Sequence, residues 1–402
     1  MGKGNWRNAL GIIATAACAL SSTRCGSPDG EITVAIALLS SEQPAYRLVL
    51  DQFTEETGIP VRLITQQYQQ VREALEAEVA AGQGQLDLVE LDVFMLAQLY
   101  RSVLPLDSLV RTFSHLRDVV DSNAFGAGSP PEADGRTHFL PHRLNWQAMV
   151  YDASALGHAP ETWDELLEVC RQHAGAIGFK ASRYEGMVCD FFPFLWQSGG
   201  DPLRPRSPES LRALRFLKQI SGTLNPAVRS YKEVSILQAQ ERKEIVLHFN
   251  WPFVVPLVRE KGLMRSQIRV APLPAGPAGS ATVLGGGYLG IPRTAPHPSE
   301  AALLVDFLLS ERVQRRLTRE LGWFPVRASG WDELSEEDRI DFSGYLKMRD
   351  ALRARPAVPE YGELSRAWQQ AFSDLLFGGK SADEVAAFVA SRLEELGEGH
   401  RP

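Results

Sequence analysis

The chain has 402 residues, of which 44% are hydrophobic, so it can bury a large apolar core. Because a single core rarely grows beyond about 250 to 300 residues, we expect two globular lobes. The formal net charge of −7 argues against a nucleic-acid or anionic-membrane surface, since phosphate binding needs clustered Lys and Arg on one face.

The amino terminus has the pattern of an export signal. A basic start precedes an apolar stretch at 9–17, which is too short to span a bilayer, since a span takes about 20 residues. Residues 1–25 are therefore expected to be a signal peptide or lipoprotein leader. Cys18 and Cys25 are alternative lipidation sites, of which Cys18 fits slightly better, and secretion with neither thiol acylated stays open. We expect an exported protein, periplasmic or on the outer face of the cell membrane and anchored there by lipid.

The mature chain opens with alternating strand and helix patterns. The expected order is strand 32–36, a helix ending near Gly58, strand 60–66, a helix through 71–79 and strand 86–91. The last strand is almost wholly apolar, as in buried parallel sheets. This alternation predicts right-handed crossovers and an open parallel sheet, whose ligands bind beyond the carboxyl ends of the strands.

Polar residues follow the first and third of these strands. Ser41 and Glu42 come after the first strand, and Asp92 comes directly after the third. Because these positions lie at the carboxyl edge of the expected sheet, all three are candidates for ligand contact. Each also has an alternative role as a cap or first-turn residue of the following helix.

A glycine run and two loop aromatics mark a later stretch. Gly286 is the centre of three adjacent glycines, which suit a sharp bend or a close approach of another group, and a short strand is expected to begin at Tyr288. Trp323 and Phe324 stand in a loop between a glycine and a proline, where large aromatics have little structural reason to be. They are typical of the wall of a binding site.

Short motifs occur in a fixed order along the chain. They are 160–166 (PETWDEL), 272–276 (PLPAG), 286–292 (GGYLGIP), 297–310 (HPSEAALLVDFLLS) and 322–326 (GWFPV). No single motif is specific, but the ordered set resembles the family 1 extracellular solute-binding proteins, the maltodextrin-binding type of receptor that serves ABC importers.

The resemblance implies an α/β fold of the class II periplasmic-binding-protein type. Each of two lobes would be a mainly parallel sheet flanked by helices, and hinge strands would join them. The expected lobes are 31–141 plus 288–330 for lobe 1 and 142–287 plus 331–402 for lobe 2. The family's mechanism would be closure about hinge strands near Asn145 and Gly286, which traps ligand in the cleft.

The resemblance also implies further binding residues. Asn145 and Trp146 lie where the family's hinge strand passes the cleft, although Asn145 and Asp152 replace the family's Asp and Asn. Asp190 lies in an aromatic helix segment beside the second-lobe half of the cleft and is a candidate hydroxyl acceptor. Trp251 matches a tryptophan that commonly stacks on the ligand. As alternatives, Trp146 could be a core aromatic and Trp251 could pack on its own helix.

Two further features have structural interpretations. Residues 162–165 form a capping box at a helix start, and we expect Trp163 to serve in packing and not in the binding site. Cys170 and Cys189 could form a disulfide in an exported chain, or both could be buried thiols.

Catalytic motifs are lacking in the sequence: there is no HExxH, GxSxG or GxxxxGK[ST] and no Cys/His cluster with metal spacing. We therefore expect no enzyme, no cofactor and no metal.

Aromatic faces with carboxylate and amide groups suit a sugar or oligosaccharide. The expected binding residues are Ser41, Glu42, Asp92, Asn145, Trp146, Asp190, Trp251, Gly286, Tyr288, Trp323 and Phe324. The predicted function is that of a monomeric ABC-transporter binding protein that delivers the sugar to a membrane permease. A polyamine-like ligand, or a sensor for a membrane signalling partner, is the alternative.

Overall fold

The computed structural model describes residues 30–112, 126–130, 135–358 and 360–398, so the predicted leader with Cys18 and Cys25 lies outside them. The chain divides into two compact units. Unit 1 is Met1–Leu144 with Gly285–Leu334, and unit 2 is Asn145–Leu284 with Ser335–Pro402. The chain therefore passes between units at 144/145, 284/285 and 334/335, where the sequence predicted 141/142, 287/288 and 330/331.

Unit 1 is built on a sheet with the strand order β2-β1-β3-β8-β4. Its strands are β1 Ile32–Ile36, β2 Val61–Thr65, β3 Leu88–Asp92, β4 Leu140–Trp146 and β8 Thr282–Gly290. Strand β1 pairs in parallel with β2 and β3, as the alternating pattern predicts, and β8 runs antiparallel to β3. The carboxyl ends of the parallel strands therefore share one edge of the sheet.

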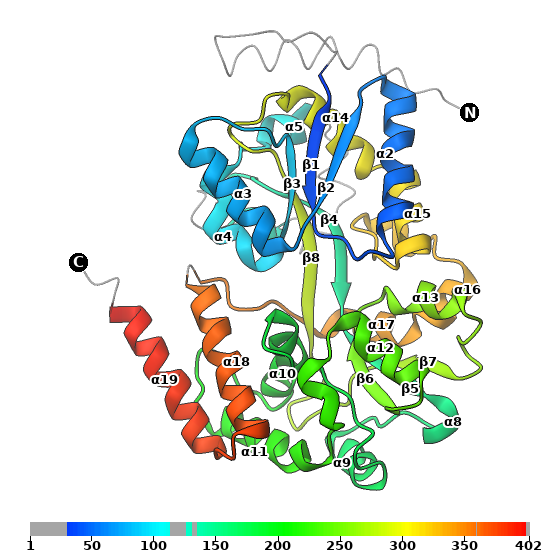
Figure 1. The fold of residues 1–402 in the computed structure, drawn as a ribbon, viewed down its shortest axis with the longest axis vertical. Helices are drawn as coiled ribbons and strands as arrows, with labels where there is room; N and C mark the ends of the chain where they lie inside the picture. The colour runs from blue at the N-terminus through cyan, green and yellow to red at the C-terminus, as the bar shows by residue number, and fades with distance from the viewer. Residues whose placement is uncertain (1–29, 113–125, 131–134, 359, 399–402) are drawn as a thin grey trace. The chain divides into compact units, whose positions relative to one another are not determined.

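Helices accompany this sheet in unit 1 (Figure 1). They are α2 Gln43–Thr57, α3 Tyr68–Ala81, α4 Leu96–Leu99, α5 Asp107–Thr112, α14 Pro298–Leu308 and α15 Glu311–Leu321, with 3-10 turns at Val93–Met95, Tyr100–Ser102 and Ala328–Trp331. In α2 the apolar residues recur at helical spacing, so Tyr46, Val49 and Phe53 share one buried face. Gly58 ends this helix with a φ of 77°, a left-handed conformation that glycine adopts without steric cost.

Strand β8 is longer than the sequence predicts. It begins at Thr282 and contains the three glycines as extended backbone, none of them with positive φ. A Cβ atom added to Gly286 would lie 2.9 Å from the carbonyl oxygen of Arg143, and one added to Gly287 would lie 2.2 Å from the carboxyl carbon of Glu90. Close approach of neighbouring groups therefore explains the glycine run, and a sharp bend does not.

Unit 2 contains a three-stranded sheet with the order β6-β5-β7. The strands are β5 Ala148–Asp152, β6 Leu247–Asn250 and β7 Ile268–Ala271, and the short β9 Leu352–Arg353 pairs with the start of β8. The central β5 is antiparallel to both neighbours, so the predicted mainly parallel sheet occurs in unit 1 and not here. All five residues of β5 are buried, which makes this strand the centre of the unit 2 core.

Helices make up most of the rest of unit 2. They are α8 Ala153–Leu156, α9 Trp163–Gln172, α10 Glu185–Gln197, α11 Pro208–Ile220, α12 Glu233–Glu241, α13 Val254–Glu260, α16 Glu336–Asp341, α17 Ser343–Lys347, α18 Tyr361–Phe377 and α19 Ala382–Glu398, with 3-10 turns at Ser221–Thr223, Pro226–Ser230 and Arg349–Ala351. Thr162 caps α9 by accepting a hydrogen bond from the Glu165 amide at 3.2 Å. The Glu165 carboxylate accepts from the amide of Glu161 and not from that of Thr162, so the expected reciprocal bond shifts by one residue. Trp163 stacks on Phe216 with ring centroids 4.4 Å apart, in the predicted packing role.

The two cysteines in the described part of the chain are both buried thiols, which is the second of the two alternatives left open by the sequence. Burial raises the pKa of the Cys170 thiol to about 11, against a smaller opposing effect of a hydrogen bond with Thr223. Across the described residues, every helix is too short or too polar to cross a membrane.

Candidate functional site

Unit 1 holds a buried polar network at the carboxyl edge of its parallel strands. Arg143 on β4 donates from Nη2 to the carbonyl oxygen of Ala37, the hydroxyl of Tyr68 and the carboxylate of Glu90, each at 2.7 Å. The other Glu90 oxygen lies 2.5 Å from Nδ1 of His142. Glu90 and His142 are shielded from solvent; both oxygens of Glu90 have partners within the protein, whereas Nε2 of His142 has none among the described residues.

Trp323 is attached to this network by two contacts. Its ring lies 4.1 Å below the Arg143 guanidinium, a cation-π arrangement, and its Nε1 donates to Glu42 Oε1 at 2.8 Å. The second oxygen of Glu42 accepts from the Leu39 amide at 2.7 Å, which fixes the segment after β1. The structure thus joins Glu42 and Trp323, which the sequence predicted separately, by a direct hydrogen bond, and places both against Arg143, which the sequence analysis did not select.

The network changes the ionisation of its two carboxylates in opposite directions. Burial raises the pKa of Glu42, and the opposing effects of Arg143 and the Trp323 hydrogen bond do not cancel it. Burial also acts to raise the pKa of Glu90, but the nearby Arg143 and His142 outweigh burial and hold that pKa below its usual value. Glu90 is therefore the ionised carboxylate that pairs with Arg143.

The other predicted residues of unit 1 differ in exposure. Ser41 is exposed and Asp92 is half-buried, with Asp92 Oδ1 accepting from the Phe94 amide at 3.5 Å as a helix cap. Tyr288 and Phe324 are fully buried, Tyr288 among the core residues of unit 1. A direct ligand contact for Ser41 and Asp92 stays a prediction, whereas Tyr288 and Phe324 are placed as packing residues, and so is Trp323, which is 2% exposed.

Gly286 and Asn145 lie at the divisions between the units. Gly286 is the second residue of the later unit 1 segment, where its missing side chain admits the backbone of β4. Asn145 is the first residue of unit 2 and is half-buried. Its Oδ1 is buried and accepts no hydrogen bond from the part of the chain that the structure describes. The predicted closure about these two residues stays a prediction.

Two predicted residues of unit 2 belong to its core. Trp146 has no exposed surface, and its Nε1 donates to the carbonyl oxygen of Tyr345 at 2.7 Å, which matches the alternative role as a core aromatic. Asp190 also has no exposed surface. Its oxygens lie 2.5 Å from Nζ and 2.7 Å from the amide of Lys180, and one also accepts from Gln147 at 2.8 Å. These internal partners occupy Asp190, so the structure favours a structural role over hydroxyl binding.

Trp251 differs from the other predicted aromatics because it is half-buried, whereas they are fully buried. It follows β6 directly, and its backbone is held at both ends: the amide donates to Asn250 Oδ1 at 3.0 Å and the carbonyl oxygen accepts from Tyr345 Oη at 2.8 Å. The indole is thus a partly solvated aromatic surface on a fixed backbone. That is the geometry needed for stacking on a ligand ring.

Glu233 and Tyr184, which were not selected from the sequence, are linked to the Trp251 backbone through Asn250. Asn250 Nδ2 donates to the backbone oxygen of Glu233 at the start of α12, and the carboxylate of Glu233 accepts from the Tyr184 hydroxyl at 2.9 Å. The Tyr184 and Glu233 side chains are half-buried. Unit 2 therefore presents an indole, a phenol and a carboxylate beside the carboxyl end of β6, a set able to stack on a ring and bond its hydroxyls.

A signal for part of what was missed does exist in the sequence. Glu90 interrupts an apolar strand, and His142 and Arg143 are adjacent in another strand; charged residues in buried strands need partners. Tyr184 and Glu233 stand at helix starts in polar surroundings, and nothing in a single sequence distinguishes them. Among the described residues, no group of three or more His, Cys, Asp or Glu side chains could hold a metal ion.

Comparison with known proteins places this fold in a family. A family model described as bacterial extracellular solute-binding protein matches residues 49–332. A probable ABC transporter-binding protein of Deinococcus radiodurans is 26% identical over 366 residues, covering 81% of this chain and 84% of that protein. A maltotriose-binding protein of Pyrococcus abyssi is 20% identical over 388 residues, covering 92% of this chain and 82% of that protein.

Solved structures give the same result for the fold. The maltose-bound MalE3 of T. maritima matches with a TM-score of 0.81 and 26% identity, covering 91% of this chain and 99% of that chain. The Thermus thermophilus maltotriose binding protein, bound with maltotriose, has a TM-score of 0.77 at 16% identity, covers 91% of this chain and 100% of that chain, and supports the fold alone. Because the family model spans more than half of its residues, this chain belongs to the bacterial extracellular solute-binding protein family.

Proposed function

We propose that this protein is the binding component of an ABC importer and that its cargo is a sugar, with an oligosaccharide of the maltodextrin class as the first candidate. The observation that carries the proposal is the half-buried Trp251, which Asn250 links by hydrogen bonds to Glu233, the partner of the Tyr184 hydroxyl. The relatives named as ABC-transporter and maltotriose-binding proteins support it.

The chemistry of this group favours a sugar over a polyamine. A sugar ring offers an apolar C–H face for an indole and hydroxyls for a carboxylate and a phenol. A polyamine needs carboxylates that are free to pair with ammonium groups. In unit 1, Glu90 is already paired with Arg143 and Glu42 is bonded to Trp323, so neither carboxylate is free for a cation. In the unit 2 group, the Lys232 ammonium already lies 5.3 Å from the centroid of the Tyr184 ring, which disfavours a second cation there.

Thermal unfolding against a ligand panel tests the cargo. Maltose, maltotriose and maltotetraose are the test ligands, with spermidine as the cationic control. At a hundred times its dissociation constant, the true ligand is expected to stabilise the folded state by about 2.7 kcal/mol, which raises Tm by at least about 2 °C in a chain of this size. A shift with spermidine and none with any sugar would reject the sugar proposal.

The variant Trp251→Ala tests the residue on which the proposal rests. Loss of the indole face is expected to weaken sugar binding by about tenfold to a hundredfold, since an aromatic stacking surface contributes about 1 to 3 kcal/mol. Trp251→Tyr retains an aromatic face and is the matched control, expected to retain most of the affinity. Isothermal titration calorimetry measures both variants. Equal affinity of Trp251→Ala and the parent protein would remove Trp251 from the site.

The protein's partners and location follow from the same proposal. The family is extracellular, and delivery to a membrane permease is the expected next step. The predicted lipid anchor at Cys18 or Cys25 and the monomeric state are also part of the proposal. Radioactive fatty-acid labelling of cells that express Cys18→Ala or Cys25→Ala tests the anchor, because label retained in both single variants would exclude each cysteine as the sole acylated residue.

A further inference from the structure

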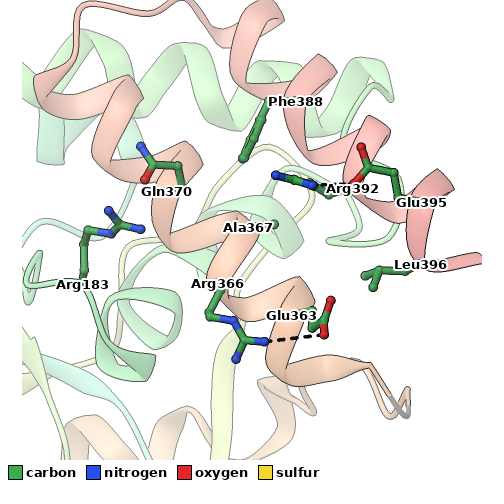
Figure 2. A pocket seen from close by; sticks show the side chains of 9 residues that line it. All are labelled: Arg183, Glu363, Arg366, Ala367, Gln370, Phe388, Arg392, Glu395 and Leu396. Atoms are coloured by element: carbon green, nitrogen blue, oxygen red, sulfur yellow. Dashed lines mark hydrogen bonds and ion pairs between the residues drawn. The ribbon is translucent and has the colours of Figure 1, made fainter. Parts of the chain in front are cut away.

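Unit 2 has a concave site that includes none of the predicted binding residues (Figure 2). We call it the α18–α19 pocket. Its volume is about 390 Å³, within the range of small-molecule sites. Its lining residues are Arg183, Glu363, Arg366, Ala367, Gln370, Phe388, Arg392, Glu395 and Leu396. They come from one face of α18, one face of α19 and the segment before α10, so three parts of unit 2 enclose it.

The lining of the pocket includes one small and one aromatic side chain. Ala367 is buried at its base, and this small side chain leaves room that a larger residue would fill. The half-buried ring of Phe388 projects into the pocket from α19 (Figure 2). The Arg392 guanidinium carbon lies 5.7 Å and the Lys380 ammonium 6.0 Å from the centroid of this ring, so Phe388 offers a ligand the part of its ring that these cations leave open.

The charges of the pocket are unbalanced. Arg392 pairs with Glu395 at 2.5 Å, and Arg366 lies 3.8 Å from Glu363. Arg183 is exposed, and among the described residues its guanidinium has no ion pair or hydrogen bond. The lining thus has three guanidinium groups and two carboxylates. The Arg183 guanidinium has two parallel N–H donors, which match the two oxygens of a carboxylate.

We propose that the α18–α19 pocket binds a small carboxylate carried on a six-membered ring. Arg183 would pair with the carboxylate, and the Phe388 ring would pack on the flat apolar face of the ligand. Sugar acids and aromatic acids share this chemistry. The proposal goes beyond sugar transport, because it involves a different part of unit 2 and neither Trp251 nor its neighbours.

Calorimetric titration of the full exported protein tests the proposal with two matched ligand pairs. Benzoate is compared with neutral benzamide, and glucuronate with neutral glucose, at low salt. At least one carboxylate is expected to bind about tenfold or more tightly than its neutral counterpart, since hydrogen bonds between charged groups supply the difference. Binding of benzoate alone assigns aromatic acids, and binding of glucuronate alone assigns sugar acids.

Two charge-removing variants locate the site. Arg183→Gln is expected to weaken carboxylate binding about tenfold or more, whereas Arg206→Gln, at an exposed arginine of unit 2 outside the pocket, is expected to leave it unchanged. The proposal is overturned if neither carboxylate binds or if Arg183→Gln binds like the parent protein. Glucuronate binding that is lost in Trp251→Ala but kept in Arg183→Gln belongs to the sugar site and also overturns it.

Discussion

Replacing Glu90 by alanine is expected to lower the free energy of unfolding of unit 1 by about 3 to 5 kcal/mol. The carboxylate is fully buried and binds Arg143, His142 and Tyr68. Its removal leaves the buried Arg143 guanidinium with Glu42, at 3.9 Å, as its remaining carboxylate partner among the described residues. Urea unfolding measures the change, and hydrogen exchange of the β1 and β3 amides assigns it to unit 1.

Two further variants separate charge from bulk in this experiment. Glu55→Ala removes an exposed carboxylate from α2 of the same unit and is expected to change stability by no more than about 0.5 kcal/mol. The double variant Glu90→Leu/Arg143→Met replaces the ion pair with apolar side chains and is expected to recover part of the loss. A loss below about 1 kcal/mol for Glu90→Ala would show that the pair is not a stabilising element of unit 1.

Acidification is expected to destabilise unit 2 through His248. The side chain is fully buried on β6 with Nε2 3.1 Å from Gln240 Oε1, and burial together with the charge of Lys180 lowers its pKa to about 3. Since this lies below the value near 6.5 of an unfolded chain, the unfolded state takes up the proton first. The neutral His248 ring therefore makes its full contribution to the free energy of unfolding above pH 6.5. This contribution is lost as pH falls toward 3, and at pH 4 the loss is about 3 kcal/mol.

Urea unfolding at a series of pH values measures this slope. His248→Gln has no titrating ring and is expected to be less stable at pH 7 but to lose less stability on acidification. His158→Gln, at an exposed position of unit 2, is the matched control and is expected to keep the parent slope. An unchanged slope in His248→Gln would assign the acid sensitivity to other groups.

The fold was predictable where a local pattern decides the structure. The apolar spacing in α2, the glycine that ends it and the apolar run of β3 each predict their element within a few residues. Strand β8 was predicted too short because three glycines resemble a turn when read alone. The space at Gly286 and Gly287 is taken by Arg143 and Glu90, which are distant in sequence, so no local pattern could reveal why glycine is needed there.

The candidate site was predictable in the same limited way. Trp251 was selected because it matches a tryptophan that commonly stacks on the ligand in the resembled family; the structure leaves it half-buried, and its contact with a ligand stays a prediction. Trp146 and Asp190 were selected for residue type and for resemblance, but residue type does not show whether a side chain faces solvent or core. Asp190 is occupied by Lys180, and Gln147 adds a second partner; these pairings arise only when α10 packs on the sheet of unit 2.

The discontinuous units have a consequence for the order of folding. Strand β3 pairs with β8 through Asp92 and Gly287, so a loop of about 195 residues closes when the unit 1 sheet is completed. Loop closure of that length slows the formation of long-range contacts. During synthesis, unit 1 cannot be finished until more than four fifths of the 402 residues have left the ribosome, and unit 2 waits still longer for α18 and α19. For most of its synthesis the nascent chain therefore has neither unit complete.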